Sequence, residues 1–156
     1  MRLAILAVGH KPPAWVAEGC AEYIKRMPRE LPLSIVEVKP EARGSKSREQ
    51  LLAAEKGRLL AVLQAYHRIV VLDERGVDLP TLKLAERLAS WMRAGGDTAL
   101  IIGGADGIDE ALKLQASEAI RLSSLTLPHA LARLILCEQL YRAVSILRKH
   151  PYHREG

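Results

Sequence analysis

At 156 residues the chain is long enough for one domain that buries a hydrophobic core without disulfide or metal support. Hydrophobic residues make up 49% of the sequence, but every apolar run falls well short of the roughly 18 residues of a membrane-spanning helix, so we expect no membrane partner. The formal net charge of +5 favours an anionic partner.

The first half of the chain predicts two strands that are each followed by a helix. Residues 3–8 form an apolar run too short for a signal peptide, so we expect a first β-strand and a cytoplasmic protein. Apolar residues at helical spacing predict a helix over 13–27, which a proline ends. Residues 33–38 predict a second strand, and the capping-box sequence Ser-Arg-Glu-Gln opens a helix over 47–66.

The second half of the chain continues this alternation. Residues 69–73 predict the clearest strand, and a helix follows over 80–92 before two glycines. Residues 98–102 predict a fourth strand. Three further elements are a short helix at 109–115, a weaker strand at 119–122 and a long helix at 129–149. Strands that alternate with helices predict a single α/β domain over 1–156, with a mainly parallel sheet and helices on both faces.

The last predicted helix is apolar around more of its circumference than one sheet contact requires. We interpret this pattern as burial on two sides, by the chain's own sheet and by a second copy of the chain. Arg133 and Gln139 interrupt the apolar surface. Either they lie at its rim, with the arginine reaching solvent, or they belong to a subunit contact or a site.

Three segments are candidates for a ligand site. Parallel sheets bind ligands beyond the carboxyl ends of their strands, which selects the chain after Leu72, after Ile102 and after Leu122. The glycine-rich run 103–107 fits neither a dinucleotide-binding nor a phosphate-loop pattern, and is a ligand contact or an ordinary turn. The leucine-rich connection 122–129 is typical of a pocket for a flat heterocycle or of a buried crossover.

Charged and metal-binding residue types give weaker signals. Basic side chains crowd residues 39–48 and 148–154, which indicates either phosphate contacts or solvated segments. The sequence Pro-Tyr-His-Arg at 151–154 combines groups that stack on a base and bind phosphate. Cys20, Cys137 and the five histidines lack metal-ligand spacing, so we expect two buried thiols and no metal site.

Four blocks of sequence form a recognisable set. They are Ile102-Gly-Gly-x-x-Gly107, Leu122-Ser-x-Leu-Thr-Leu-Pro-His129, Glu138-Gln-Leu-Tyr-Arg142-Ala and the ending His150-Pro-Tyr-His-Arg-Glu155. Together they resemble the RlmH family of SPOUT-class methyltransferases over the whole chain, with small departures at Ala105, Asp106 and Ala130. The resemblance implies a C-terminal trefoil knot, S-adenosylmethionine as cofactor, a homodimer, and methylation of N3 of a pseudouridine in 23S ribosomal RNA.

The resemblance also implies a set of site residues. The expected cofactor-binding residues are Leu72, Gly103, Gly104, Leu122, Ser123, Ser124, Leu125, Thr126 and Leu127. Arg142 and Arg154 would stabilise negative charge that develops on the pseudouridine ring, and Tyr152 would stack on it. His153 or His129 would accept the N3 proton. In this family the tail of one subunit is expected to complete the site of the other.

Two other functions compete with this interpretation. One is a SPOUT methyltransferase that acts on transfer RNA, and the other is a non-catalytic, ribosome-associated RNA-binding factor. A Rossmann-type oxidoreductase is disfavoured, because residues 8–11 after the first strand lack the glycine pattern that binds a dinucleotide. The modest net charge predicts action on the large subunit or the 70S ribosome rather than on naked RNA.

Overall fold

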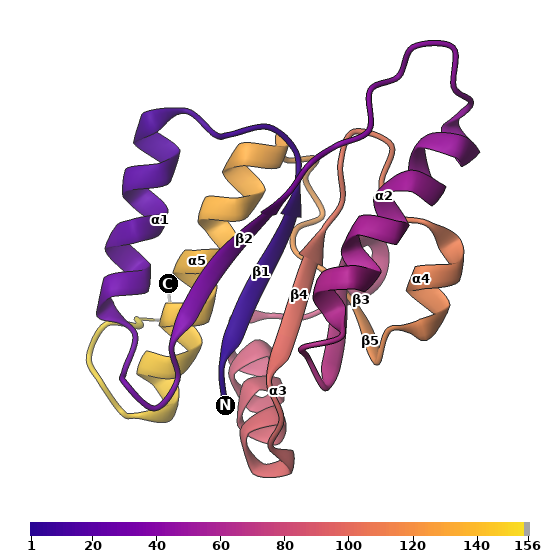
Figure 1. The fold of residues 1–156 in the computed structure, drawn as a ribbon. Coiled ribbons are helices and arrows are strands. Elements are labelled where there is room, and N and C mark those ends of the chain that lie inside the picture. The colour runs from indigo at the N-terminus through magenta and orange to yellow at the C-terminus, as the bar shows by residue number, and fades with distance from the viewer. Residues whose placement is uncertain (155–156) are drawn as a thin grey trace.

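A parallel five-stranded sheet forms the middle of the molecule (Figure 1). The computed structural model describes residues 1–154. The strands are β1 (Leu3–Val8), β2 (Leu33–Val38), β3 (Arg68–Asp78), β4 (Thr98–Ile102) and β5 (Glu118–Arg121). The helices are α1 (Ala14–Arg26), α2 (Arg48–Leu63), α3 (Thr81–Ala94), α4 (Glu110–Gln115) and α5 (His129–Leu147). The strand order is β2-β1-β4-β3-β5, which confirms the predicted α/β class.

Helices cover both faces of this sheet because its central strands are apolar on both sides. Successive side chains of a strand point to opposite faces. In β1, Leu3 and Ile5 pack in a core with α1, α3 and α5, whereas Leu6 and Val8 pack in a second core with α2 and α4. The continuous apolar run that predicted a buried strand therefore supplies two cores at once.

β3 is longer than its sequence predicted. Its pairing with β5 shifts register between Leu72 and Val77, so the intervening polar residues form a bulge. A Cβ atom on Gly76 would lie 2.7 Å from backbone atoms of β5, so only glycine fits against that strand. The polar sequence Asp-Glu-Arg-Gly looks like a turn, and the prediction stopped at residue 73 for that reason.

The packing of α5 explains part of its wide apolar surface. α5 lies between α1 and α3 on one face of the sheet, so neighbours within the chain bury much of it, and burial by a second copy stays a prediction. Arg133 is 2% exposed, and its Nη1 donates a hydrogen bond to Glu37 Oε1 at 2.9 Å. The arginine therefore does not reach solvent at a rim, as one interpretation held.

Two further predictions concern the cysteines and a membrane-spanning helix. Cys20 and Cys137 are free and buried, as predicted, and α1 and α5 bring their thiols into contact. Within residues 1–154, no helix combines the length and apolar character needed to cross a bilayer. The trefoil knot that the resemblance implies stays a prediction.

Candidate functional site

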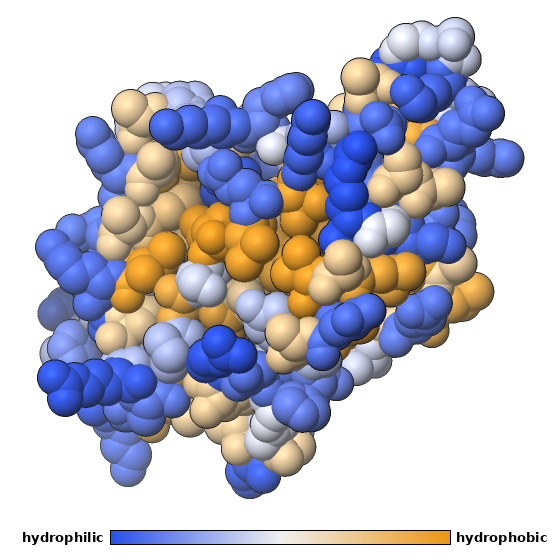
Figure 2. Space-filling view, viewed as in Figure 1, coloured by the Kyte–Doolittle hydropathy of each residue, from blue (hydrophilic) through white to orange (hydrophobic). Residues whose placement is uncertain are grey.

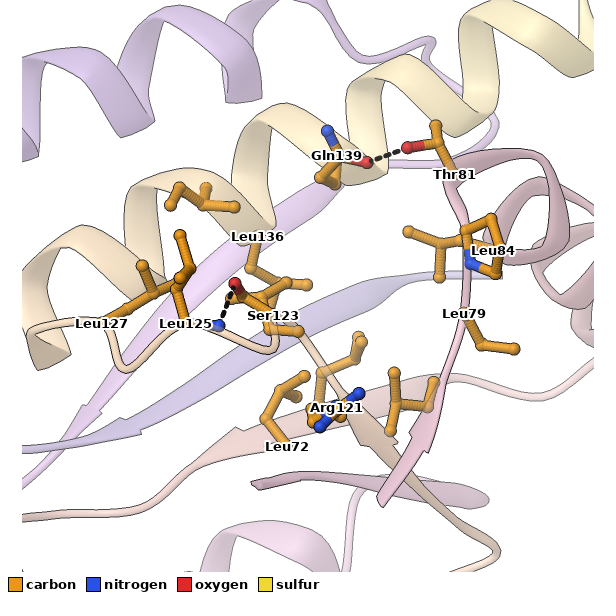
Figure 3. A pocket seen from close by; sticks show the side chains of 15 residues that line it. Leu72, Leu79, Thr81, Leu84, Arg121, Ser123, Leu125, Leu127, Leu136 and Gln139 are labelled. Atoms are coloured by element: carbon orange, nitrogen blue, oxygen red, sulfur yellow. Dashed lines mark hydrogen bonds between the residues drawn. The ribbon is translucent and has the colours of Figure 1, made fainter. Parts of the chain in front are cut away.

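An apolar pocket of about 400 Å³ lies where β3, the segment after β5 and the start of α3 meet α5. Figure 3 shows Leu125 and Leu127 on one side of the pocket and Leu79 and Leu84 on the other. Leucine and isoleucine side chains form most of its wall. Such a wall suits the flat, uncharged face of a heterocycle.

A few polar groups lie among these leucines. Thr81 Oγ1 donates to Gln139 Oε1 at 2.9 Å, which ties the start of α3 to α5 beside the pocket (Figure 3). Ser123 Oγ accepts the backbone N–H of Leu125 at 2.9 Å and so holds the leucine-rich segment in a turn. The sequence left open whether Gln139 lies at a rim or in a site. In the structure it lines the pocket.

A wider and more polar cleft of about 870 Å³ adjoins this pocket. Leu72, Leu122 and Leu125 line both spaces, so the two form one continuous site. The turn 103–107 forms one wall of the cleft, and the β3 bulge and His129 also face it. The β3 bulge and the segments after β4 and β5 thus meet where the sheet rule predicted a ligand site.

The two glycines that begin this turn have different steric roles. A Cβ atom on Gly103 would lie 2.5 Å from the carbonyl oxygen of Gly107, a distance that backbone atoms cannot accommodate. A Cβ atom on Gly104 would have only an ordinary contact, 3.4 Å from Val8 Cγ1. The close fold of the turn therefore depends on glycine at 103, whereas position 104 has room for a methyl group.

His129 connects α5 to the carboxyl ends of β1 and β4. Its ring packs against Gly9, where an added Cβ would lie 3.1 Å from Cε1. Burial and the nearby Arg133 charge lower its pKa, and hydrogen bonds to the backbone of Ile102 and Gly103 oppose that change only in part. His129 is therefore neutral at pH 7 and can accept a proton.

The lowered pKa of His129 predicts a loss of stability in mild acid. The unfolded chain takes up this proton near pH 6.5, before the folded chain does, so protonation favours unfolding as the pH falls below 6.5. We expect the urea midpoint of the wild type to decrease from pH 7 to pH 5 more steeply than that of His129→Gln. Equal slopes in the two proteins would contradict the inference, because the variant keeps every other titrating group.

The end of α5 and the tail form a second cluster, which we call the tail cluster: Glu138, Arg142, Tyr152 and His153. Arg142 Nε donates to Glu138 Oε1 at 2.7 Å, and the Tyr152 hydroxyl donates to the same oxygen at 3.1 Å. The Arg142 guanidinium lies 4.7 Å from the centre of the Tyr152 ring, and its Nη1 is 3.3 Å from His153 Nδ1. The glutamate raises the pKa of Arg142, so this arginine stays charged.

The tail cluster is remote from the cleft within one chain. His129 and Arg142 are about 20 Å apart along α5, at a rise of roughly 1.5 Å per residue. Figure 1 shows α5 running from the carboxyl edge of the sheet toward the opposite edge. Of the expected catalytic residues, only His129 lines the cleft. Arg154 is exposed, and Glu155 lies outside the described residues.

All of the expected cofactor residues line one or both cavities. The sequence interpretation missed Asp73, Glu74 and Arg75 of the bulge, together with Arg48 and Lys113, which also line the cleft. Lys113 Nζ is 3.3 Å from Asp73 Oδ2, and Arg48 Nη2 donates to the carbonyl oxygen of Asp106 at 2.8 Å. For the residues of the bulge, the one signal in the sequence was a run of charged residues directly after the apolar part of β3.

Comparisons with known proteins agree along the whole chain. A family model described as "Predicted SPOUT methyltransferase" matches residues 1–153. The chain is 69% identical to Ribosomal RNA large subunit methyltransferase H of Dechloromonas aromatica, with 100% of both chains covered. It is 57% identical to the protein of the same name from Ralstonia nicotianae, with 99% of each covered.

A solved structure gives the same fold at low identity. The chain superposes on a probable methylase family protein from Haemophilus influenzae with a TM-score of 0.57 and 14% identity. The match covers 99% of this chain and 70% of that one. At this identity the likeness concerns the fold alone.

Proposed function

The chain belongs to the SPOUT methyltransferase family, and from that premise we propose that it transfers a methyl group from S-adenosylmethionine to N3 of a pseudouridine in 23S ribosomal RNA. The names of its relatives support the large-subunit RNA as substrate. We further propose one cytoplasmic domain over 1–156 that carries the C-terminal knot. Its substrate would be the assembled large subunit or the 70S ribosome.

The observation that carries this proposal is the continuous site formed by the leucine pocket and the glycine turn. The pocket has apolar walls of a size that suits adenine, with Gln139 and Thr81 as polar neighbours. The turn at Gly103 lines the cleft with backbone, and its close fold has no room for a side chain at that position. The residues present therefore fit S-adenosylmethionine, which supplies an activated methyl group when it is bound.

The residues of the chain would then handle the acceptor base. N3 of pseudouridine carries a proton that must leave as the methyl group arrives. His129 lines the cleft and is neutral at pH 7, which makes it a candidate to accept that proton. A cationic group beside the ring carbonyls would stabilise the negative charge that develops. Arg142 and Arg154 are the expected sources of this charge.

A homodimer would explain how Arg142 and the tail can act on the base although they lie about 20 Å from His129 along α5. Arg142, Tyr152 and His153 lie at the end of α5 away from their own cleft, so they can act only in the cleft of another subunit. A two-fold axis would place each tail cluster against the partner's cleft and give two equivalent sites. The preformed contacts within the tail cluster support a binding role, because they hold Tyr152 against the arginine.

Labelled methyl transfer tests the proposal directly. Purified protein and methyl-labelled S-adenosylmethionine would be added to ribosomes from a strain that lacks the relative of this chain. We expect label in one nucleoside of the large-subunit RNA, identified by mass analysis as methylated pseudouridine. Label in transfer RNA instead would favour the first competing function. Ribosome binding without any transfer would favour the non-catalytic factor.

A further inference from the structure

Positive side chains without a carboxylate partner gather at the carboxyl edge of the sheet. Within residues 1–154, the exposed Lys11, Lys39, Arg48 and Arg75 at this edge form no ion pair, and we call them the edge cations. Lys11 and Lys39 follow the ends of β1 and β2, Arg48 begins α2, and Arg75 lies in the β3 bulge. Because the strands are parallel, their ends bring these residues to the rim of one site.

Most carboxylates at the same edge already have a positive partner. Asp106 Oδ2 is 2.6 Å from Arg43 Nη2, and Glu41 Oε2 is 3.1 Å from Arg58 Nη2. Asp73 and Asp109 are bridged by lysines in the same way. Among the described residues of this edge, Glu49, Glu55 and Glu74 form no ion pair, and the buried Glu55 accepts the Glu41 N–H instead. The edge cations therefore keep their charge available for an external anion.

The segment 39–47, between β2 and α2, is held in place beside these cations. Arg58 Nη1 donates to the carbonyl oxygen of Lys39 at 2.9 Å, and the Glu41 N–H donates to Glu55 Oε2 at 3.0 Å. Figure 1 shows this segment standing above the end of the sheet, and Figure 2 shows hydrophilic side chains over it. Its tip is open, since a Cβ atom on Gly44 would meet nothing within 4 Å.

We propose that the edge cations form a docking surface for the phosphodiester backbone of the RNA substrate, beside the cofactor cleft. The spacing of separate charges along an edge matches a row of phosphates better than one small anion. The anchored segment lowers the cost of ordering this surface on binding. Arg48 and Arg75 line the cleft itself, so the surface leads from the outer rim to the reacting base. The proposal rests on the proposed function.

Substitution of the outer lysines tests this surface. Lys11→Gln and Lys39→Gln each remove one charge without breaking an ion pair, and neither residue lines the cleft. Arg93→Gln, at the end of α3 on the opposite edge, removes the same charge and serves as the control. The readouts are the KM for ribosomes in methyl transfer as a function of salt, kcat at saturating ribosomes, and S-adenosylmethionine affinity by calorimetry.

We expect each lysine variant to raise the ribosome KM by about three- to tenfold. The slope of log KM against log salt concentration should decrease by the amount that about one phosphate contact contributes. The value of kcat, the cofactor affinity and the Arg93→Gln variant should stay close to wild type. Lysine variants that match Arg93→Gln would overturn the proposal. A higher KM with unchanged salt dependence would also overturn it, by pointing to a ribosomal protein. If the wild type transfers no methyl group, the proposed function fails, and cosedimentation of the same variants with ribosomes still tests the surface.

Discussion

Gly103→Ala is expected to reduce methyl transfer by roughly 100-fold or more, because the added methyl group forces the turn 103–107 to move. The new Cβ would lie 2.5 Å from the Gly107 carbonyl oxygen, and backbone at both positions would have to separate. A displacement of about 1 Å at a site that positions a reacting group costs about two orders of magnitude in rate. The cofactor affinity should fall with the rate, since this turn lines the cleft.

Gly104→Ala is the matched control for this experiment. It adds the same methyl group to the neighbouring residue of the same turn, where the space is sufficient. Calorimetric titration with S-adenosylmethionine and the rate of methyl transfer would be measured for both variants, with thermal melting to confirm folding. Similar losses in the two variants would show that the close approach at Gly103 is not what the site needs.

Mixed dimers give the second large effect. A chain that ends after His150 lacks Tyr152, His153 and Arg154. In Gly103→Ala the turn 103–107 is displaced. Each homodimer should therefore be nearly inactive. A dimer that contains one chain of each kind keeps one intact cleft opposite one intact tail. Its rate should recover to about half of the wild-type rate per dimer, since one of two equivalent sites is complete.

Two different affinity tags would isolate the mixed dimers after coexpression, and the rate per dimer would then be measured. Recovery requires that cleft and tail belong to different subunits. If the site were completed within one chain, each chain would contain one defect and the mixed dimer would stay inactive. A monomeric protein in size-exclusion chromatography would likewise contradict the proposed assembly.

The elements of the fold were predictable because local patterns and the overall architecture agree. Apolar runs marked β1 and β4, and the capping box before Arg48 is present, since Ser47 Oγ accepts the Gln50 N–H at 3.1 Å. The extension of β3 was not predictable, because its polar residues are held by pairing with β5 across a bulge. Local sequence does not encode that distant partner.

The position of the cavities was more predictable than the surroundings of the other expected site residues. The sheet rule and the resemblance selected Leu72, Gly103 and the 122–127 segment, which line the cavities, and their contact with a cofactor stays a prediction. Spacing could not predict that Arg133 is buried, because its partner Glu37 lies on a strand far back in the sequence. Nor could it separate Arg142 from the cleft, since that distance depends on where α5 begins and how it crosses the sheet.

α5 joins the two halves of the proposed site as a spacer of fixed length and phase. One residue inserted between His129 and Glu138 would push the tail cluster about 1.5 Å along the axis and turn it about 100° around it. The segment 39–47 has an open tip that can lengthen at little entropic cost. Changes in chain length are therefore tolerated very differently in two parts of this protein, and α5 is expected to keep the same number of residues wherever the dimeric site is kept.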